Sequence, residues 1–221
     1  MNNSYQIELE NIVFRRATIN DNLKQIANLI YDTNPYIYPY WFNNNREEAI
    51  IFLSQKIKED NFFFNYNNIY IAIDTNTKNI IGIINALDKT INLDYNYLEL
   101  EKINDRYKET LNNYIEPIIE TVKNNNYMYI SNVCILGDYR GKKVGTRLLG
   151  YFIEQMENNG YTEFVLECLI HNLRAKNLYH RLGFQEMGEK LGFGGSFSDV
   201  EVVFMKRKKG DYLPEEFQNF I

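Results

Sequence analysis

The chain has 221 residues, of which 45% are hydrophobic and 24% charged, and its formal net charge is −5. This composition is ordinary for a globular protein and argues against a protein that coats nucleic acid, because phosphate binding needs clustered positive charge. The length allows one substantial core, so we expect a single domain over residues 1–221.

The apolar runs are too short to cross a bilayer, and the opening MNNSYQIELE has no hydrophobic region of a signal peptide. The two cysteines, Cys134 and Cys168, come without a Cys/His cluster, so the pattern indicates neither a disulfide framework nor a zinc site. We therefore expect a cytoplasmic protein without a metal, a membrane partner or a nucleic-acid partner.

The N-terminal part is predicted to form a strand and two helices. The segment IVFRRAT, which begins at Ile12, is typical of a strand, and a helix follows with Asp21 near its start. Two prolines in the segment 33–42 argue against regular structure there. A second helix is predicted over residues 46–58, where apolar residues recur at helical spacing.

The middle of the chain is predicted to contain a hairpin and an insertion. Two β-branched runs, 69–73 and 80–87, flank a polar turn and predict a β-hairpin. Residues 88–126 are polar and helix-like, with Pro117 expected to break or begin a helix. This stretch is too short and polar to hold its own core, so it is interpreted as an insertion between the third and fourth strands.

The last third shows the clearest alternation of strand and helix patterns. The predicted elements are a strand over 127–136, a helix over 143–160, a strand over 162–170, a helix over 172–184, and a closing hairpin from 184–193 and 199–207. Asn172 is suited to cap the last helix and Gly183 to end it. The order predicts a mixed sheet covered by helices, of the α/β (α+β) class.

The turn YRGKKVGT, residues 139–146, combines glycines with cationic side chains at a strand-to-helix junction. Backbone N–H groups at the start of the next helix would point at one spot and, with the helix dipole, favour an anion such as a pyrophosphate. The spacing matches neither a Walker A loop nor a Rossmann turn. Nucleotide binding stays open as an alternative, as does a basic turn that only caps a helix.

The segment NVCILGDYRGKKVGTRLL resembles the acetyl-CoA-binding motif of the GNAT acetyltransferase superfamily, [QR]-x-x-G-x-[GA], here Arg140 to Gly145. The departure from the motif is Lys143 at the central glycine position. In a right-handed helical conformation the Lys143 side chain would cost the turn little and its N–H would stay available, whereas a positive φ at this position would disfavour a residue other than glycine.

A second segment, residues 172–184, is similar to the family's N-x-x-A-x-x-[LF]-Y-x-x-x-G-F pattern. The positions in register are Asn172, Ala175, Leu178, Tyr179, Gly183 and Phe184. The two motifs occur in the family's order, and the likeness covers most of the chain except the variable segments 31–66 and 88–126.

The resemblance implies a mostly antiparallel twisted sheet flanked by helices, and an N-acetyltransferase that uses acetyl-CoA as co-substrate and no metal. It places the pantetheine arm along the strand before the turn and beside Asn172. The implied CoA-binding residues are Val133, Cys134, Ile135, Arg140, Gly141, Lys142, Lys143, Val144, Gly145, Thr146 and Asn172.

The resemblance also assigns Tyr179 as the general acid that protonates the leaving thiolate; the alternative is a tyrosine packed in the core. The general base stays open, because the strand YMYISNVCIL carries no carboxylate where many relatives have a glutamate. Glu167 on the neighbouring strand, a carboxylate of the insertion or a chain of water molecules are the alternatives.

The partner implied is an amine acceptor, either a small molecule or a peptide, and the family also allows a homodimer. The aromatic stretch with Tyr36, Tyr38, Tyr40 and Trp41 is a candidate wall for the acceptor pocket, or plain packing. A catalytically idle CoA-binding or sensor domain is the main alternative function, because of the missing strand carboxylate.

Overall fold

In this computed structural model, a seven-stranded mixed sheet has the order β1-β2-β3-β4-β5-β7-β6. The structure describes residues 9–60, 62–90, 105–110, 113, 115–192 and 200–211. The strands are β1 (Ile12–Arg16), β2 (Ile69–Asp74), β3 (Ile80–Leu87), β4 (Met128–Ile135), β5 (Glu163–Leu169), β6 (Gln185–Gly192) and β7 (Glu201–Lys208). Only β4 and β5 pair in parallel, so the predicted fold class is confirmed.

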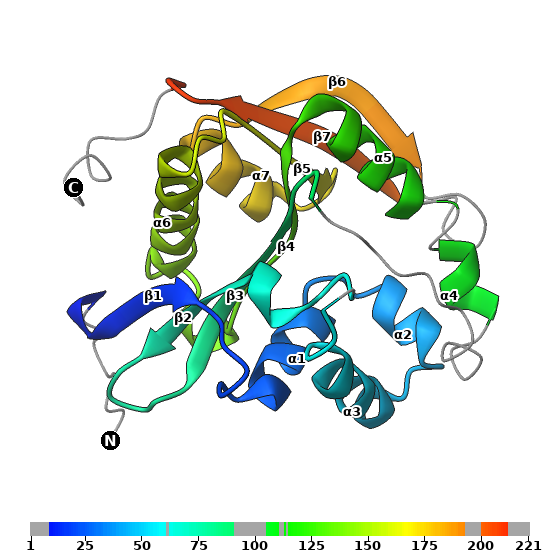
Figure 1. Cartoon of the computed structure of the whole chain (residues 1–221), viewed down its shortest axis with the longest axis vertical. Coiled ribbons are helices and arrows are strands. Elements are labelled where there is room, and N and C mark those ends of the chain that lie inside the picture. Colours follow the sequence, from blue (N-terminus) through cyan, green and yellow to red (C-terminus); the bar gives the residue numbers. More distant parts are fainter. Residues whose placement is uncertain are drawn as a thin grey trace.

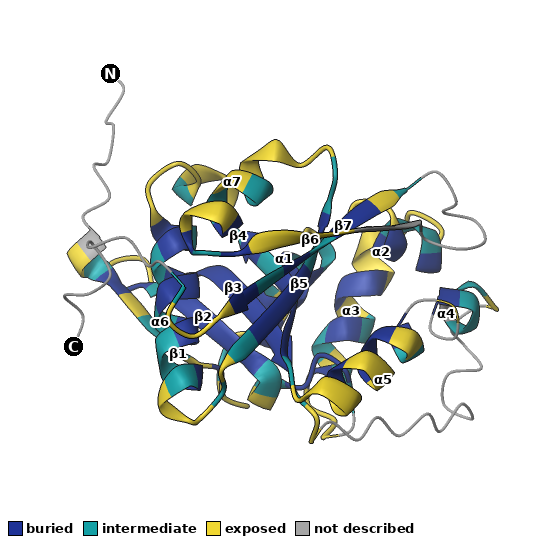
Figure 2. Ribbon diagram, turned by 90° about the horizontal axis from the view of Figure 1, so that it is seen from above, coloured by how far each residue is buried: buried dark blue, intermediate teal, exposed yellow. Residues whose placement is uncertain are grey.

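Helices cover both faces of the sheet (Figure 1). They are α1 (Leu23–Tyr31), α2 (Ile37–Trp41), α3 (Arg46–Lys56), α4 (Asp105–Thr110), α5 (Glu116–Asn125), α6 (Val144–Asn158) and α7 (Leu173–Arg181). One hydrophobic core joins residues of α1, α2, α3 and α5 to the sheet, and a second joins α6 and α7 to the opposite face. Figure 2 shows the buried strands between helices whose outer sides are exposed.

The capping residue of α1 differs from expectation. The side chain of Asn22, not Asp21, caps α1 by accepting the Gln25 N–H at 3.1 Å. Asp21 instead accepts two hydrogen bonds from the guanidinium of Arg15 at 2.6 and 2.8 Å. Capping needs only a short polar side chain, and the neighbouring strand supplies a cation for the carboxylate.

The prediction of irregular structure over residues 33–42 is wrong for its second half, which forms α2. Pro39 lies in the first turn of this short helix, where its missing N–H removes no helical hydrogen bond. The side-chain oxygen of Asn34 accepts the N–H groups of Tyr36 and Ile37 at 3.0 Å and so starts the helix.

The insertion supplies two helices where the structure describes it. Pro117 stands in the first turn of α5, as expected for a helix start, and α5 ends at Asn126 in a left-handed conformation. Leu98, Leu111 and Tyr114, apolar residues of the insertion, lie outside the described residues.

Candidate functional site

Strands β4 and β5 separate along the middle of the sheet. They pair only from Met128 to Ile130, whereas β4 continues to pair with β3 as far as Ile135. The register between β3 and β4 shifts between Asn85 and Ala86, which leaves Ser131 as an extra residue. A bulge of this kind bends a strand. From Ser131 onward, the β5-facing edge of β4 therefore carries no strand ladder.

The basic turn after β4 is anchored at both ends. The Nε of Arg140 donates to the carbonyl oxygen of Ile135 at 2.7 Å, and the hydroxyl of Tyr139 donates to Asp74 Oδ2 at 2.6 Å. Gly141 has φ +80°, a conformation for which glycine is suited. The turn is thus held against β2 and β4 rather than projecting into solvent.

Of the two conformations considered for Lys143, the structure shows the one with positive φ. Its φ is 62° and its ψ is 2°, in the left-handed region, where a side chain costs about 1 kcal/mol. Lys143 precedes α6 as its N-cap residue and does not belong to its first turn. The chain must reverse there to bring the next N–H groups toward the strand.

The start of α6 presents unpaired N–H groups to the end of β4. The hydrogen bond from the Arg147 N–H to the Lys143 carbonyl is the first of the helix, so Val144, Gly145 and Thr146 have no acceptor inside it. Gly145 packs closely: a Cβ there would lie 3.3 Å from Ile135 Cγ1 and 3.6 Å from Leu178 Cδ2. The absence of a side chain lets α6 approach both β4 and α7.

A cleft of about 610 Å³ runs from this turn along the open edge of β4 to α7. Every residue predicted to bind CoA lines it except Lys142. Two cations that the sequence analysis did not select, Arg174 and Arg181, also line it, together with Arg140 and Lys143. Arg174 and Arg181 both lie on α7, seven residues and so about two helical turns apart. This spacing was the signal that could have revealed them.

Helix α7 places Asn172 and Tyr179 beside the cleft. The Asn172 side chain caps α7 by accepting the Ala175 N–H at 3.1 Å, as predicted, and its amide N–H groups are not used in the cap. Tyr179 is buried, with 8% of its surface exposed. Burial, followed by the nearby Cys168 and Glu167, raises the pKa of Tyr179 well above its ordinary value, so the phenol stays protonated at neutral pH.

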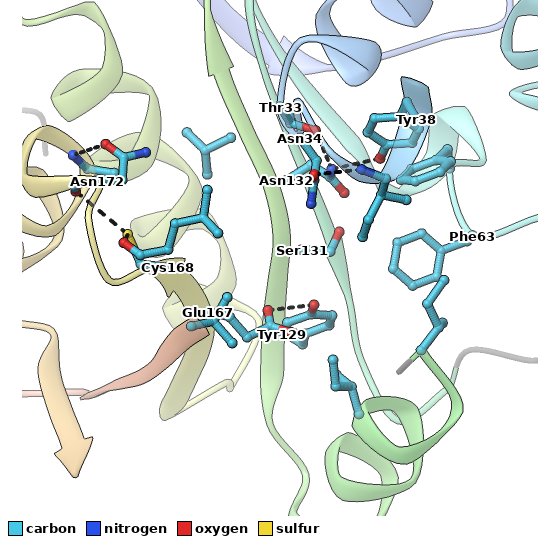
Figure 3. Close-up of a pocket in the computed structure, with 18 of the residues that line it drawn as sticks. Thr33, Asn34, Tyr38, Phe63, Tyr129, Ser131, Asn132, Glu167, Cys168 and Asn172 are labelled. Atoms are coloured by element: carbon cyan, nitrogen blue, oxygen red, sulfur yellow. Dashed lines mark hydrogen bonds between the residues drawn. The ribbon is translucent and has the colours of Figure 1, made fainter. Parts of the chain in front are cut away.

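A second cavity, of about 160 Å³, lies on the side of β4 that faces α2 and α5 (Figure 3). Its walls come from segments far apart in the sequence. They include Tyr38 and Trp41 of the predicted aromatic stretch, whereas Tyr36 is exposed and Tyr40 bonds to Glu109 at 3.2 Å. Two members of the aromatic stretch, Tyr38 and Trp41, therefore line a cavity, and Tyr36 and Tyr40 do not.

Two hydrogen-bonded groups of polar side chains line this second cavity. The hydroxyl of Tyr129 donates to the carboxylate of Glu167 at 2.6 Å. The amide nitrogen of Asn132 donates to Thr33 Oγ1 at 2.7 Å and to the Tyr38 hydroxyl at 3.1 Å. In Figure 3 Tyr129 and Glu167 lie side by side, and Asn132 points toward Thr33 and Tyr38.

The two cavities share part of their lining. Val133, Asn172 and Tyr179 belong to both, so the cleft and the second cavity meet beside the open edge of β4. Glu167 lies on the second-cavity side of this junction. One elongated ligand and one small ligand would thus touch each other next to Tyr179.

The two cysteines lie on either side of the junction and are each 5% exposed, as expected for small buried residues. Cys134 lines the cleft and Cys168 lines both the β5 side of the second cavity and the approach to Asn172. Burial raises the pKa of each thiol to about 11. Both therefore remain protonated, and poorly nucleophilic, at neutral pH.

The fold and the cavities together define a mixed sheet whose cation-lined cleft opens into a small pocket. The chain belongs to the acetyltransferase (GNAT) family, whose model matches residues 30–184.

Curated relatives match over a limited stretch. N-alpha-acetyltransferase 30 of Schizosaccharomyces pombe is 39% identical over 56 residues, which are 25% of this chain and 37% of the relative. Thialysine N-epsilon-acetyltransferase of Mus musculus is 33% identical over 66 residues, 30% of this chain and 39% of the relative. The match therefore spans less than two-fifths of these relatives' length.

Solved structures share the fold over nearly the whole chain. An N-acetyltransferase from Staphylococcus aureus Mu50 superimposes with a TM-score of 0.60 at 20% identity, covering 88% of this chain and 99% of that one. The NatC complex bound to Gag peptide and CoA gives a TM-score of 0.54 at 19% identity, covering 90% and 98%. At this identity the likeness establishes the fold alone.

Within the described residues, no group of three or more His, Cys, Asp or Glu side chains is placed to hold a metal ion. In the same part of the chain, no helix has the length and apolar character needed to cross a membrane.

Proposed function

We propose that the protein transfers the acetyl group of acetyl-CoA to a primary amine by direct attack, in a ternary complex. The observation that carries the proposal is the junction at Val133, Asn172 and Tyr179, where a cleft suited to CoA opens into a separate small cavity. Two substrates held in these spaces would have their reacting ends in contact, which is the main requirement for acyl transfer between them.

The cleft supplies the groups that CoA needs. The N–H groups at the start of α6 and the cations Arg140, Lys143, Arg174 and Arg181 suit the pyrophosphate. The ladder-free edge of β4 after Ser131 offers backbone groups to the amides of the pantetheine arm, much as a strand would. The thioester would then lie beside Tyr179, and a β4 N–H can polarise its carbonyl.

Tyr179 is the proposed proton donor. The amine nitrogen forms a bond to the thioester carbon, the carbon–sulfur bond breaks, and the leaving thiolate takes the phenolic proton. The raised pKa keeps this proton on Tyr179 at neutral pH before the thiolate forms. Tyr179 lines both the cleft and the second cavity, which supports its hydroxyl as the group that reaches the sulfur.

Glu167 is the proposed proton acceptor for the amine. A primary amine arrives as an ammonium ion and must lose a proton before it can attack. Glu167 is the carboxylate that lines the second cavity, and the Tyr129 hydroxyl holds it at 2.6 Å. It lies on β5, so the missing carboxylate on β4 is replaced from the neighbouring strand across the opening.

The cysteines do not favour a route through an acetyl-cysteine. Such a route needs a thiolate, and the pKa of about 11 at both Cys134 and Cys168 leaves almost none at neutral pH. Direct transfer needs no group beyond those already placed at the junction.

The test is the rate of acetyl-CoA consumption with a panel of amines for the wild-type protein and Tyr179→Phe. We expect the variant to lose about 100-fold or more in kcat while its Kd for CoA changes little. Tyr151→Phe is the matched control, because it removes a phenol that lines neither cavity, and it should retain the wild-type rate.

Full activity of Tyr179→Phe would show that the proton donor is wrong. CoA binding without turnover of any amine would instead favour the alternative, a CoA-binding sensor domain. ATP or GTP binding tighter than CoA would favour nucleotide binding at the turn.

A further inference from the structure

The second cavity is nearly uncharged. Among the described residues that line it, Glu167 is the single side chain with a formal charge at neutral pH. Among these described residues, a ligand that enters the space therefore meets one carboxylate and meets neither a second carboxylate nor a cation. Unpaired charges are strongly disfavoured in a buried site.

The rest of the cavity suits a compact apolar group. Ile37, Trp41, Phe63, Phe64 and Ile118 contribute apolar surface, and each of these side chains is at least nine-tenths buried. The volume of about 160 Å³ is close to the roughly 150 Å³ of an apolar cavity that holds benzene. The space thus fits one ring or one branched aliphatic group and not a long chain.

One of the polar side chains that line the cavity, Asn132, offers an acceptor. Asn132 is 8% exposed, and its amide N–H groups are donated to Thr33 and Tyr38. These two bonds leave the amide oxygen as the atom that Asn132 can offer to a ligand. Together with Glu167 it presents acceptors to a ligand whose polar end consists of N–H donors, as in an ammonium group.

We infer that the acetyl acceptor is a singly charged primary amine attached to a compact apolar group, such as an arylalkylamine or a branched alkylamine. This inference rests on the proposed function. The amine would lie at the junction between Glu167 and Tyr179, and the apolar group would lie against Trp41 and Phe63. Polyamines are excluded by their second charge, and free amino acids by their carboxylate.

The experiment compares kcat/KM at saturating acetyl-CoA for phenethylamine, isoamylamine, putrescine, spermidine, phenylalanine and phenylalaninamide. We expect phenethylamine to exceed spermidine, putrescine and phenylalanine by at least 10-fold. Phenylalaninamide, which lacks the carboxylate, should recover most of the loss seen with phenylalanine. Spermidine, putrescine or phenylalanine as the best acceptor would overturn the inference and leave the proposed function standing.

Equilibrium binding to the protein saturated with CoA separates the two claims. If phenethylamine binds at least 10-fold more tightly than putrescine but is not acetylated, the inference holds and the proposed function fails. If phenethylamine and putrescine bind equally tightly, or if neither binds, the inference fails.

A charge variant sharpens the test. Asn132→Asp adds a second carboxylate to the cavity, so the ratio of kcat/KM for putrescine to that for phenethylamine should rise at least 10-fold. Asn67→Asp is the matched control, because Asn67 is exposed and does not line this cavity. An unchanged ratio in Asn132→Asp, or an equal rise in Asn67→Asp, would contradict the inference.

Discussion

The cleft and the second cavity meet at Tyr179 but are built in opposite ways. The cleft, of about 610 Å³, is lined by four cations and by the N–H groups of one turn, most of them within two short segments of the chain. The second cavity, of about 160 Å³, has one carboxylate among its described residues and draws its walls from α2, α5, α7, β4, β5, β7 and the loop before β2. The difference teaches that the proposed donor site depends on local backbone geometry, whereas the proposed acceptor site depends on packing between distant segments.

Gly145→Phe is the largest expected disturbance of the donor site. A Cβ at this position already lies 3.3 Å from Ile135 Cγ1, so a phenyl group must push α6 away from β4 and close the cleft. We expect the Kd for CoA, measured by calorimetry, to rise more than 100-fold. Gly137→Ala is the control, because a Cβ at Gly137 meets no atom within 4 Å. CoA binding of wild-type strength in Gly145→Phe would break the assignment of the cleft.

Glu167→Gln should disturb the acceptor side alone. The amide keeps the shape and an acceptor for the Tyr129 hydroxyl but cannot take a proton from the amine. We expect kcat/KM for the amine to fall about 100-fold at pH 7 and the loss to shrink as pH rises, because more amine is then already neutral. The Kd for CoA should stay within about 2-fold, which isothermal titration would check. A loss that is independent of pH would argue against the role of Glu167 as the base.

The thiols on the two sides of the junction should be equally unreactive. At pH 8 a pKa of about 11, against an ordinary 9.0, leaves about 100-fold less thiolate, so alkylation of the native protein should be slower than in denaturant by at least this factor. The raised pKa also makes the free energy of unfolding depend on pH. Below pH 9 the thiols are protonated in the folded and the unfolded state. Between pH 9 and 11 the thiols of the unfolded state ionise first, so the free energy of unfolding falls as pH rises.

Iodoacetamide labelling followed by mass spectrometry measures the rate at each cysteine. Fast labelling of Cys134 or Cys168 in the native protein would reopen the route through an acetyl-cysteine.

Lys143→Gly should have the smallest effect, and it should stabilise the protein instead of impairing it. Glycine adopts the φ of 62° without the steric cost of a side chain, so the free energy of unfolding should rise by about 1 kcal/mol. The Kd for CoA should change by less than about 3-fold, because the N–H groups remain and three cations still line the cleft. Thermal denaturation and calorimetry measure both. A destabilised variant would contradict the left-handed conformation.

Much of the lining of the cleft was accessible from the sequence because its signals are local. The glycines, the cationic turn and the Asn172 cap act through backbone geometry within a few residues, and all residues predicted to bind CoA except Lys142 line the cleft. Two features were not: the conformation of Lys143 depends on how the turn docks on β4, and α2 forms with Pro39 in its first turn. Neither fact is encoded in residue type alone.

The sequence by itself determined the order of the strands and of the helices other than α2, the fold class and the position of the basic turn, because hydrophobic periodicity and glycine placement act at short range. Only the tertiary structure decided that β4 separates from β5 after Ile130, and that Glu167, Asn132 and Trp41 share one small cavity. These residues lie tens of positions apart, and their meeting depends on which faces of the sheet the helices cover. The charge that the cavity offers to an acceptor is therefore a property of the packing and not of any motif.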